Sequence, residues 1–403
     1  MTDTAAARAR RFVILLGWVS LFADLCYEGM RGAVGPYLEA LGESAAAVGF
    51  VAGAGEALGY GLRYVTGALA DRTKRYWALT IAGYLPNLVA VPLLALAGSW
   101  PAVAGLVALE RLGKAIRSPA KSTLASFAAK DLGAGKTFAI QEAMDQTGAV
   151  LGPLAFAAIL AWRGGGLAGY RAGFVALAVP AVIVIALLLR ARRLYPDPRQ
   201  LEPAVQTDAP LGPRYAIYLV GVALVAFGLV DWPLLAYHLK AAHVVSADWA
   251  LIASYSIAMA ADGAAALLAG WLFDRSRSPA RVVAVTVALG AGYAPLVLGA
   301  SSSLPWLAIP GVALWALARS STESIGKALI ATLVPAGQRG RAYGLYYLVW
   351  GIAWWGGSVA FGWLYGIDPE YASIAMVTAL LCGAAVVALS ARHTRPTSPN
   401  KSR

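Results

Sequence analysis

Apolar segments of about 20 residues recur along the whole chain, and they restrict the possible folds more than any other feature of the sequence. A helix of this length crosses the ~30 Å hydrocarbon core of a bilayer. Charged residues make up only 13% of the chain, against roughly 25% in soluble domains. The sequence therefore predicts an integral membrane protein, surrounded by the lipid bilayer.

The apolar segments and the breaks between them predict twelve helices. We expect them at 12–38, 45–69, 77–98, 101–128, 137–161, 171–190, 215–238, 247–272, 281–300, 305–333, 341–364 and 371–391. The longest break, 190–214, is rich in proline and charge. The predicted domains are an N-terminal six-helix bundle at 1–190, a cytoplasmic linker at 191–214, and a C-terminal six-helix bundle at 215–403 that ends in a short basic tail.

Basic residues in the loops predict the orientation, because Lys and Arg are retained on the cytoplasmic side. With both termini in the cytoplasm, 22 of the 33 basic residues lie in cytoplasmic tails and loops. The opposite side holds three, which are Arg163, Arg171 and Lys240. We therefore expect a multi-pass plasma (inner) membrane protein with both termini cytoplasmic. These loops also account for the net charge of +12, so no nucleic-acid partner is expected.

The sequence lacks the patterns of several other functional classes. It has three His and two Cys residues, and it has neither a zinc-ligand spacing nor a nucleophile elbow. The segment "GAGKT" at 133–137 lacks the upstream glycine of a nucleotide-binding loop. We therefore expect no enzyme activity, no catalytic residues, no metal and no cofactor.

Three short motifs occur twice in the same order. "GALADRTKR" (67–75) and "GWLFDRSRS" (270–278) share G-x-L-x-D-R at an offset of 203 residues. "KSTLASFAA" (121–129) aligns with "KALIATLVP" (327–335) at an offset of 206, and "GKTFA" with "GRAYG" at 205. The two halves are therefore predicted to be repeats, as in many transporters that bind substrate between their halves.

The first of these motifs, together with "GAVLGP" at 148–153, resembles the major facilitator superfamily (MFS). The resemblance covers essentially the full chain. It implies an all-α membrane protein with twelve transmembrane helices in two six-helix bundles related as repeats. It also implies a secondary active transporter that moves a small organic solute by alternating access. In the family, the Asp of the loop motif helps to hold the cytoplasmic side closed. The gating residues implied by position are Gly67, Asp71, Arg72, Gly270, Asp274 and Arg275.

Ionisable residues are distributed with a three-fold rhythm. The third, sixth, ninth and twelfth predicted helices contain no Asp, Glu, Lys or Arg in their interiors. Because a charge facing lipid is costly, the charged helices should surround an interior and the other four should face lipid.

The charged side chains inside the predicted helices are candidates for binding substrate or protons. In the N-terminal half, six acids face six bases, which predicts ion-pair networks across a cavity. On the first helix, Asp24, Glu28 and Arg31 fall within a ~60° arc. The alternative is that such pairs only fix helices together. The candidates are Asp24, Tyr27, Glu28, Arg31, Glu56, Arg111, Lys114, Glu142, Asp145, Asp231, Arg319, Glu323, Trp350 and Trp354.

Several assignments remain open at this level. Asp24 or Glu28 is the first choice for a coupling proton, with Glu142 or Asp145 as the rival. Arg117, near the cytoplasmic end of its helix, is assigned to the gate. His238, at the outer end of its helix, is expected at the surface.

The two mid-span tryptophans, Trp350 and Trp354, either pack in the core or form an aromatic wall for substrate. We expect a monomer that binds a small molecule and protons. A lipid or amphiphile flippase or exporter on the same fold is the alternative function. Neither the charge of the substrate nor the direction of transport follows from the sequence.

Overall fold

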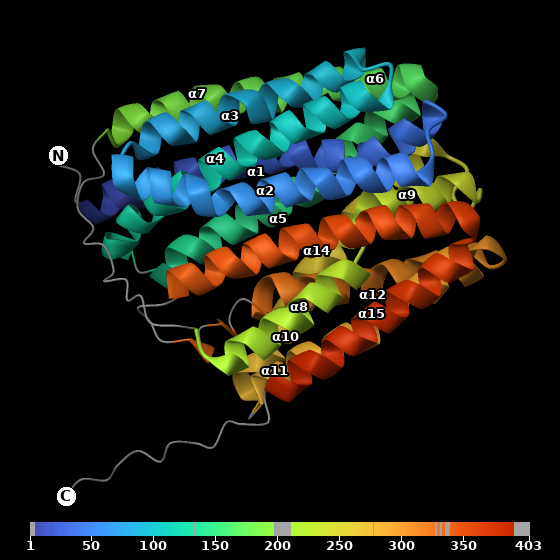
Figure 1. Ribbon diagram of the computed structural model, residues 1–403. Coiled ribbons are helices and arrows are strands. Elements are labelled where there is room, and N and C mark those ends of the chain that lie inside the picture. The colour runs from blue at the N-terminus through green and yellow to red at the C-terminus, as the bar shows by residue number, and fades with distance from the viewer. Residues whose placement is uncertain are drawn as a thin grey trace, which may run out of the picture.

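Helices and the short turns between them make up the described residues, which contain no strand. The computed structural model describes residues 5–132, 134–196, 211–276, 278–326, 329–330, 333–334 and 339–390. The helices run side by side in one elongated bundle (Figure 1). The predicted all-α fold is confirmed.

The N-terminal half contains the first six passes. They are α1 (Ala5–Ala40), α2 (Ala45–Thr73), α3 (Tyr76–Leu93) with η1 (Leu94–Leu96), α4 (Trp100–Leu132), α5 (Ala134–Arg163), and α6 (Gly166–Ala176) with α7 (Ala178–Leu194). We call the end of the bundle where α1 begins the near end, and the end where α1 finishes the far end. In Figure 1 the near end is on the left.

The C-terminal half contains the other six passes, and each lies within several residues of its predicted span. They are α8 (Pro213–Gly228) with α9 (Trp232–Ala241), α10 (Asp248–Arg275), α11 (Pro279–Gly290) with η2 (Pro295–Gly299) and η3 (Ala300–Ser302), η4 (Pro305–Leu307) with α12 (Ala308–Ser320) and η5 (Ser321–Gly326), α14 (Arg339–Ile367), and α15 (Pro369–Ser390). The predicted linker falls largely at 197–210, outside the described residues.

Within the described residues, nine passes are long and apolar enough to cross a membrane. The other three are α4, α12 with η5, and α14. Length is not the reason for α4 and α14, which have 33 and 29 residues. Instead, α4 carries a run of charged residues, and α14 is rich in Trp, Tyr and Gly, which lower its hydropathy. The pass with α12 is described only in part beyond Gly326.

The predicted continuous helix at 215–238 is wrong, because this pass is broken. Helix α8 ends at Gly228 and α9 begins at Trp232. Pro233 explains the break: it has no N–H to donate, and its ring would clash with the carbonyl of Leu229 in a continuous helix. Asp231 caps the new helix start by accepting a hydrogen bond from the Trp232 amide at 2.8 Å. The break therefore places a carboxylate at mid-span.

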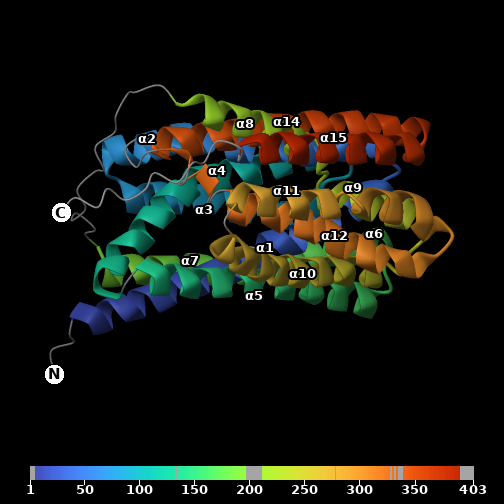
Figure 2. The same ribbon diagram turned by 90° about the horizontal axis from the view of Figure 1, so that it is seen from below.

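The two halves have separate cores but pack along each other. One core contains residues of α1 to α7 together with Ile252, and the other contains residues of α8 to α15 together with Ala45, Tyr60 and Ala149. Across the interface, α2 lies beside α14 and α5 beside α10 (Figure 2). The passes that contain α3, α7, α11 and α15 have no charge in their interiors, and they lie at the margins of the bundle (Figure 1). The exact domain boundaries remain predictions.

Glycines let α1 and α5 approach closely. Gly148 faces the carbonyl oxygen of Leu21, and Gly152 faces that of Leu25, and a Cβ on either glycine would overlap that oxygen. Small residues allow such backbone contact between membrane helices. This contact sets the distance between the charged face of α1 and that of α5.

We expect Gly152→Ala to lower the stability of the protein by about 1–3 kcal/mol, because the added methyl group forces α1 and α5 apart. The thermal unfolding midpoint in detergent measures the effect. Gly105→Ala is the matched control, since a Cβ at Gly105 would meet nothing within 4 Å. Equal midpoints for the two variants would contradict this account of the packing.

Candidate functional site

Arg31 lies at the centre of an ion-pair network that joins the two halves. Its Nη2 atom is 2.7 Å from Asp231 Oδ1 on the C-terminal half and 3.1 Å from Glu56 Oε1 on α2. Arg31 is 5% exposed and Asp231 is 2% exposed. A charge buried this deeply is tolerated only when it is paired. The break between α8 and α9 therefore supplies the carboxylate that Arg31 needs.

The network continues through the N-terminal half to α4. Glu56 is shared between Arg31 and Arg111, whose Nη2 is 2.9 Å from Glu56 Oε1. Arg111 also lies 3.3 Å from Glu110, which accepts a hydrogen bond from Asn87 at 2.6 Å. Positive and negative charges thus alternate from α1 through α2 to α4.

A second group of charges belongs to the C-terminal half. Arg319 is 3.3 Å from Asp262 and 3.1 Å from Glu323. Tyr60 of α2 donates a hydrogen bond to Glu323, so this group also touches the N-terminal half. Tyr255 of α10 likewise donates to Glu28 at 2.6 Å. The structure therefore brings Glu28, Arg31, Glu56, Arg111, Asp231, Arg319 and Glu323 together in the middle of the bundle.

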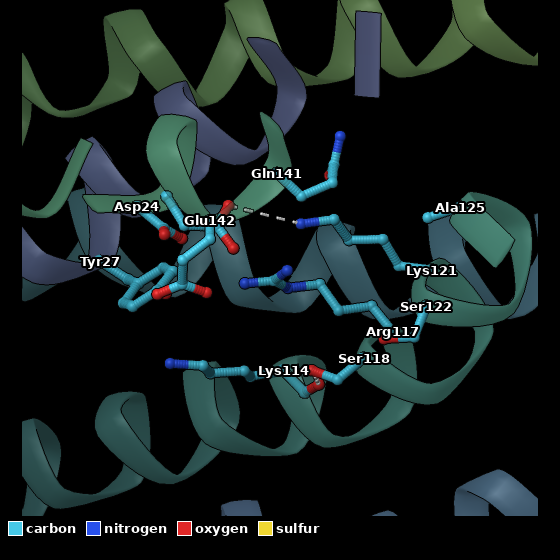
Figure 3. Close-up of a pocket in the computed structure, with 11 residues that line it drawn as sticks. Asp24, Tyr27, Lys114, Arg117, Ser118, Lys121, Ser122, Ala125, Gln141 and Glu142 are labelled. Carbon is cyan, nitrogen blue, oxygen red and sulfur yellow. Dashed lines mark hydrogen bonds and ion pairs between the residues drawn. The ribbon is translucent and has the colours of Figure 1, made fainter. Parts of the chain in front are cut away.

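A cavity of about 260 Å³ opens between α1, α4 and α5, on the near side of this network (Figure 3). Its size is enough for several water molecules or a small solute. Every residue of its lining except Ala125 carries a polar or charged group. The residues that line it are Asp24, Tyr27, Lys114, Arg117, Ser118, Lys121, Ser122, Ala125, Gln141, Glu142 and Asp145.

Three charged groups of the cavity have no oppositely charged partner. Within the described residues, no Lys, Arg or His nitrogen lies within 4.0 Å of the Asp24 carboxylate, and no carboxylate lies that close to Lys114 or Arg117. The Lys114 ammonium lies 3.8 Å from the centroid of the Tyr27 ring instead. Arg117 donates a hydrogen bond to the Tyr84 hydroxyl at 3.0 Å.

The remaining charges of the cavity are held by neighbours. Lys121 contacts the Ser20 hydroxyl and lies 3.9 Å from Asp145 Oδ1. Glu142 is exposed at the rim and accepts a hydrogen bond from Gln146 at 3.2 Å. The cavity therefore combines one long ion pair, one solvated carboxylate and the three groups without an ionic partner.

The predicted aromatic pair lies outside this lining. Trp350 and Trp354 are 1% and 0% exposed and meet edge to face at 5.4 Å. Trp354 also stacks on Tyr60 at 6.3 Å. These contacts are those of core packing. The surface position expected for His238 is wrong: the residue is 1% exposed, and its Nδ1 lies 2.9 Å from the Tyr365 hydroxyl.

The loop-motif residues differ between the halves. A Cβ on Gly67 would lie 3.7 Å from Pro119 of α4, whereas a Cβ on Gly270 would meet nothing within 4 Å. Arg72 is exposed, and the Arg275 guanidinium lies 4.1 Å above the Trp271 ring. The side chains of Asp71 and Asp274 lie outside the described part of the structure. The gating roles of the six motif residues and of Arg117 remain predictions.

An ion-pair cluster at the far end was missed from the sequence. Lys240, just inside the end of α9, lies 2.9 Å from Glu39 of α1 and 3.2 Å from Asp248 of α10. Asp248 also accepts hydrogen bonds from the Gly166 amide at 2.8 Å and the Tyr170 hydroxyl at 3.1 Å. One feature of the sequence indicated this cluster: Lys240 is one of only three basic residues predicted on the non-cytoplasmic side.

Backbone contacts between the two halves also join them at the far end. A Cβ on Gly35 would overlap the carbonyl oxygen of Pro233, and one on Gly49 would overlap that of Ser358. Each contact joins an N-terminal helix to a C-terminal one. The halves are therefore in direct backbone contact on the far side of the central network.

The chain belongs to the Major Facilitator Superfamily, whose sequence profile matches residues 16–309. This assignment confirms the resemblance seen in the loop motif and makes the protein a membrane transporter by family. An uncharacterized protein of Mycobacterium tuberculosis is 39% identical over 371 residues, which are 90% of this chain and 88% of the relative.

Two solved structures show the same fold. The peptide transporter POT has a TM-score of 0.72 and 17% identity, and covers 94% of both chains. A bacterial homolog of the human lysosomal transporter Spinster, in an inward-facing and unoccupied conformation, has a TM-score of 0.70 and 16% identity. The match covers 96% of this chain and 97% of that one.

We expect Arg31→Gln to destabilise the protein by about 3–5 kcal/mol, because it leaves Asp231 and Glu56 buried without their shared cation. The double variant Arg31→Gln/Asp231→Asn also removes the unpaired charge of Asp231. It should therefore recover part of the lost stability. Unfolding of wild type, both single variants and the double variant gives the coupling energy between the two sites. Additive effects of the two substitutions would show that the pair does not hold the halves together.

Proposed function

We propose that this protein is a secondary active transporter that moves a small organic solute by alternating access. The observation that carries the proposal is the asymmetry between the two ends. The halves are joined at the far end by Lys240 and by backbone contacts, while a charged cavity lies on the near side. The transporter family supports this assignment.

The excess of basic residues in loops at the near end supports a cytoplasmic position for that end. The protein is then an inner-membrane monomer with both termini cytoplasmic, and the structure is in an inward-facing state. The inward-facing conformation of the solved Spinster homolog, which has the same fold, supports this orientation.

The transport cycle would exchange one set of contacts between the halves for another. Opening the far end separates Lys240 from Glu39, while closing the near end brings together the ends of α2 and α10, which carry Asp71 and Asp274. The central pair of Arg31 and Asp231 lies between these two gates and can serve as the pivot. The six loop-motif residues and Arg117 are the proposed near-end gate.

Proton coupling is the proposed source of energy, and Asp24 is the proposed proton carrier. It lines the cavity and has no cationic partner, unlike Glu28, Glu56 and Asp231, which are each paired with Arg31. A carboxylate without a cationic partner can gain and lose a proton without breaking an ion pair. The polar lining of the cavity favours a polar solute over a lipid, so the flippase alternative receives no support from it.

We expect Asp24→Asn to abolish proton-driven transport while leaving the unfolding midpoint close to that of wild type, because an amide cannot carry the proton. Proteoliposomes are incubated with a metabolite extract under an imposed pH gradient, and accumulated compounds are identified by mass spectrometry. Glu142→Gln at the rim of the same cavity is the matched variant. Wild-type accumulation in Asp24→Asn, or loss only in Glu142→Gln, would remove Asp24 from this role.

Removing the far-end cation should shift the protein toward the outward-open state. We expect Lys240→Gln to raise the population with separated far ends about two- to tenfold, from the loss of two partly exposed ion pairs. Spin labels at Gly98→Cys and Ser303→Cys, in a Cys382→Ala background, report the distance between the halves by double electron–electron resonance. Arg171→Gln, also a far-side basic residue, should change nothing. Identical distance distributions for all three proteins would refute the far-end gate.

A further inference from the structure

We propose that the transported solute is an organic anion whose carboxylate or phosphate group is held by Lys114 and Arg117. The inference rests on the proposed transporter function and names the substrate class for the same cavity. The two side chains lie one turn apart on α4, and both line the cavity.

The first argument is the difference between these two cations, the half-buried Lys114 and the buried Arg117, and the buried arginines of the two ion-pair groups. Arg31, Arg111 and Arg319 each have at least two carboxylates within 4.0 Å. Lys114 and Arg117 have none among the described residues, although Arg117 is only 4% exposed. Because a buried cation requires a counter-charge, the missing partner is expected to be the ligand.

The present partners of the two cations are weak ones. Lys114 lies on the Tyr27 ring, and Arg117 lies 4.3 Å from the centroid of the Tyr84 ring and binds its hydroxyl. The Nε atom of Arg117 is buried without any hydrogen-bond partner. A cation on an aromatic face gains about 0.5–2 kcal/mol, and a charge-assisted bond to an oxyanion is stronger. An arriving anion would therefore improve on these contacts.

The geometry is suited to one anionic group. Figure 3 shows the nitrogen ends of Lys114, Arg117 and Lys121 pointing the same way, toward the part of the cavity that holds Tyr27 and Asp24. Two cations that point into one cavity can share a carboxylate or phosphate, as fixed donors do in other anion sites. Lys121 lies 3.9 Å from Asp145 and is a weaker candidate.

Proton loading and anion binding would then assist each other. The charged or titratable groups around Asp24 are Tyr27 and Glu28 on its own helix, Lys114, Arg117 and Lys121 on α4, and Glu142 and Asp145 on α5. When Asp24 takes a proton, one negative charge of the cavity that holds the two cations is lost. The cavity then becomes more positive and attracts an anion more strongly. This charge balance links the coupling ion to the substrate.

A matched set of four probes tests the charge of the ligand. Phenyl phosphate, benzoate, benzyl alcohol and benzylamine share one ring and differ chiefly in charge. Binding to the purified protein is measured by thermal stabilisation, which rises with ligand concentration by mass action. We expect the two anions to stabilise the wild type, and the alcohol and amine not to do so. Stabilisation by benzylamine alone, or by no probe up to about 10 mM, would overturn the proposal.

Variants then assign the anion to its residues. Lys114→Gln and Arg117→Gln should each weaken anion binding by about tenfold to a hundredfold, the effect of losing one charged hydrogen bond. Lys114→Arg and Arg117→Lys keep the charge and should lose less. Arg192→Gln, at an exposed basic residue of α7, should bind as wild type does. Unchanged anion binding in both Gln variants would overturn the assignment. If a Gln variant fails to fold, the charge-retaining variant at the same position (Lys114→Arg or Arg117→Lys) and the four probes still test the proposal.

The extract experiment separates this inference from the proposed function. Accumulation of cations or neutral compounds alone, driven by the pH gradient, would leave a transporter but refute an anionic substrate. Absence of any accumulation would refute the proposed coupled transport itself. Accumulated anions that disappear in Lys114→Gln would support both.

Discussion

Everything in this structure depends on how a bilayer protein compensates charges that it has removed from water. Arg31 meets this requirement with a carboxylate from the other half, so the link between the halves and the neutralisation of the bundle are one interaction. The requirement also fixes local structure. Asp231 can reach Arg31 because Pro233 breaks the seventh pass, which leaves the carboxylate at a helix start instead of on a helix face.

The charges fall into two classes that suit different tasks. Those of the central network have well-matched partners and alternate in sign, which favours a firm connection between helices. Those of the near-side cavity have aromatic rings, hydroxyls, an amide or one long ion pair as neighbours, which favours exchange of partners. Residues that connect helices and residues proposed to bind ligand therefore lie on neighbouring turns of the same helices. On α4, Arg111 belongs to the first class, and Lys114, one turn later, to the second.

Much of this arrangement could be predicted from the sequence. The length of the apolar segments predicted the passes, and the helical arc of Asp24, Glu28 and Arg31 correctly placed them toward the interior. The pairing of Arg31 with Asp231 was not predictable, because the two lie 200 residues apart and meet only through packing. Pro233 itself indicated a break, but the apolar residues on both sides of it favoured one continuous helix at 215–238. The burial of His238 was missed because its position near a helix end does not reveal the neighbouring α14, whose Tyr365 covers it.

The far-end cluster differs from the central network in its contact with solvent. The side chains of Lys240, Glu39 and Asp248 are 19%, 28% and 17% exposed, whereas those of Arg31 and Asp231 are 6% and 2% exposed. At physiological ionic strength the Debye length is about 8 Å, so dissolved ions weaken attraction between exposed charges and hardly affect buried ones. If the far end faces the outside of the cell, as proposed, the external salt concentration would weaken the ion pairs of Lys240 and leave the pair of Arg31 and Asp231 almost unaffected. Brine and fresh water would set different resting conformations for the same molecule.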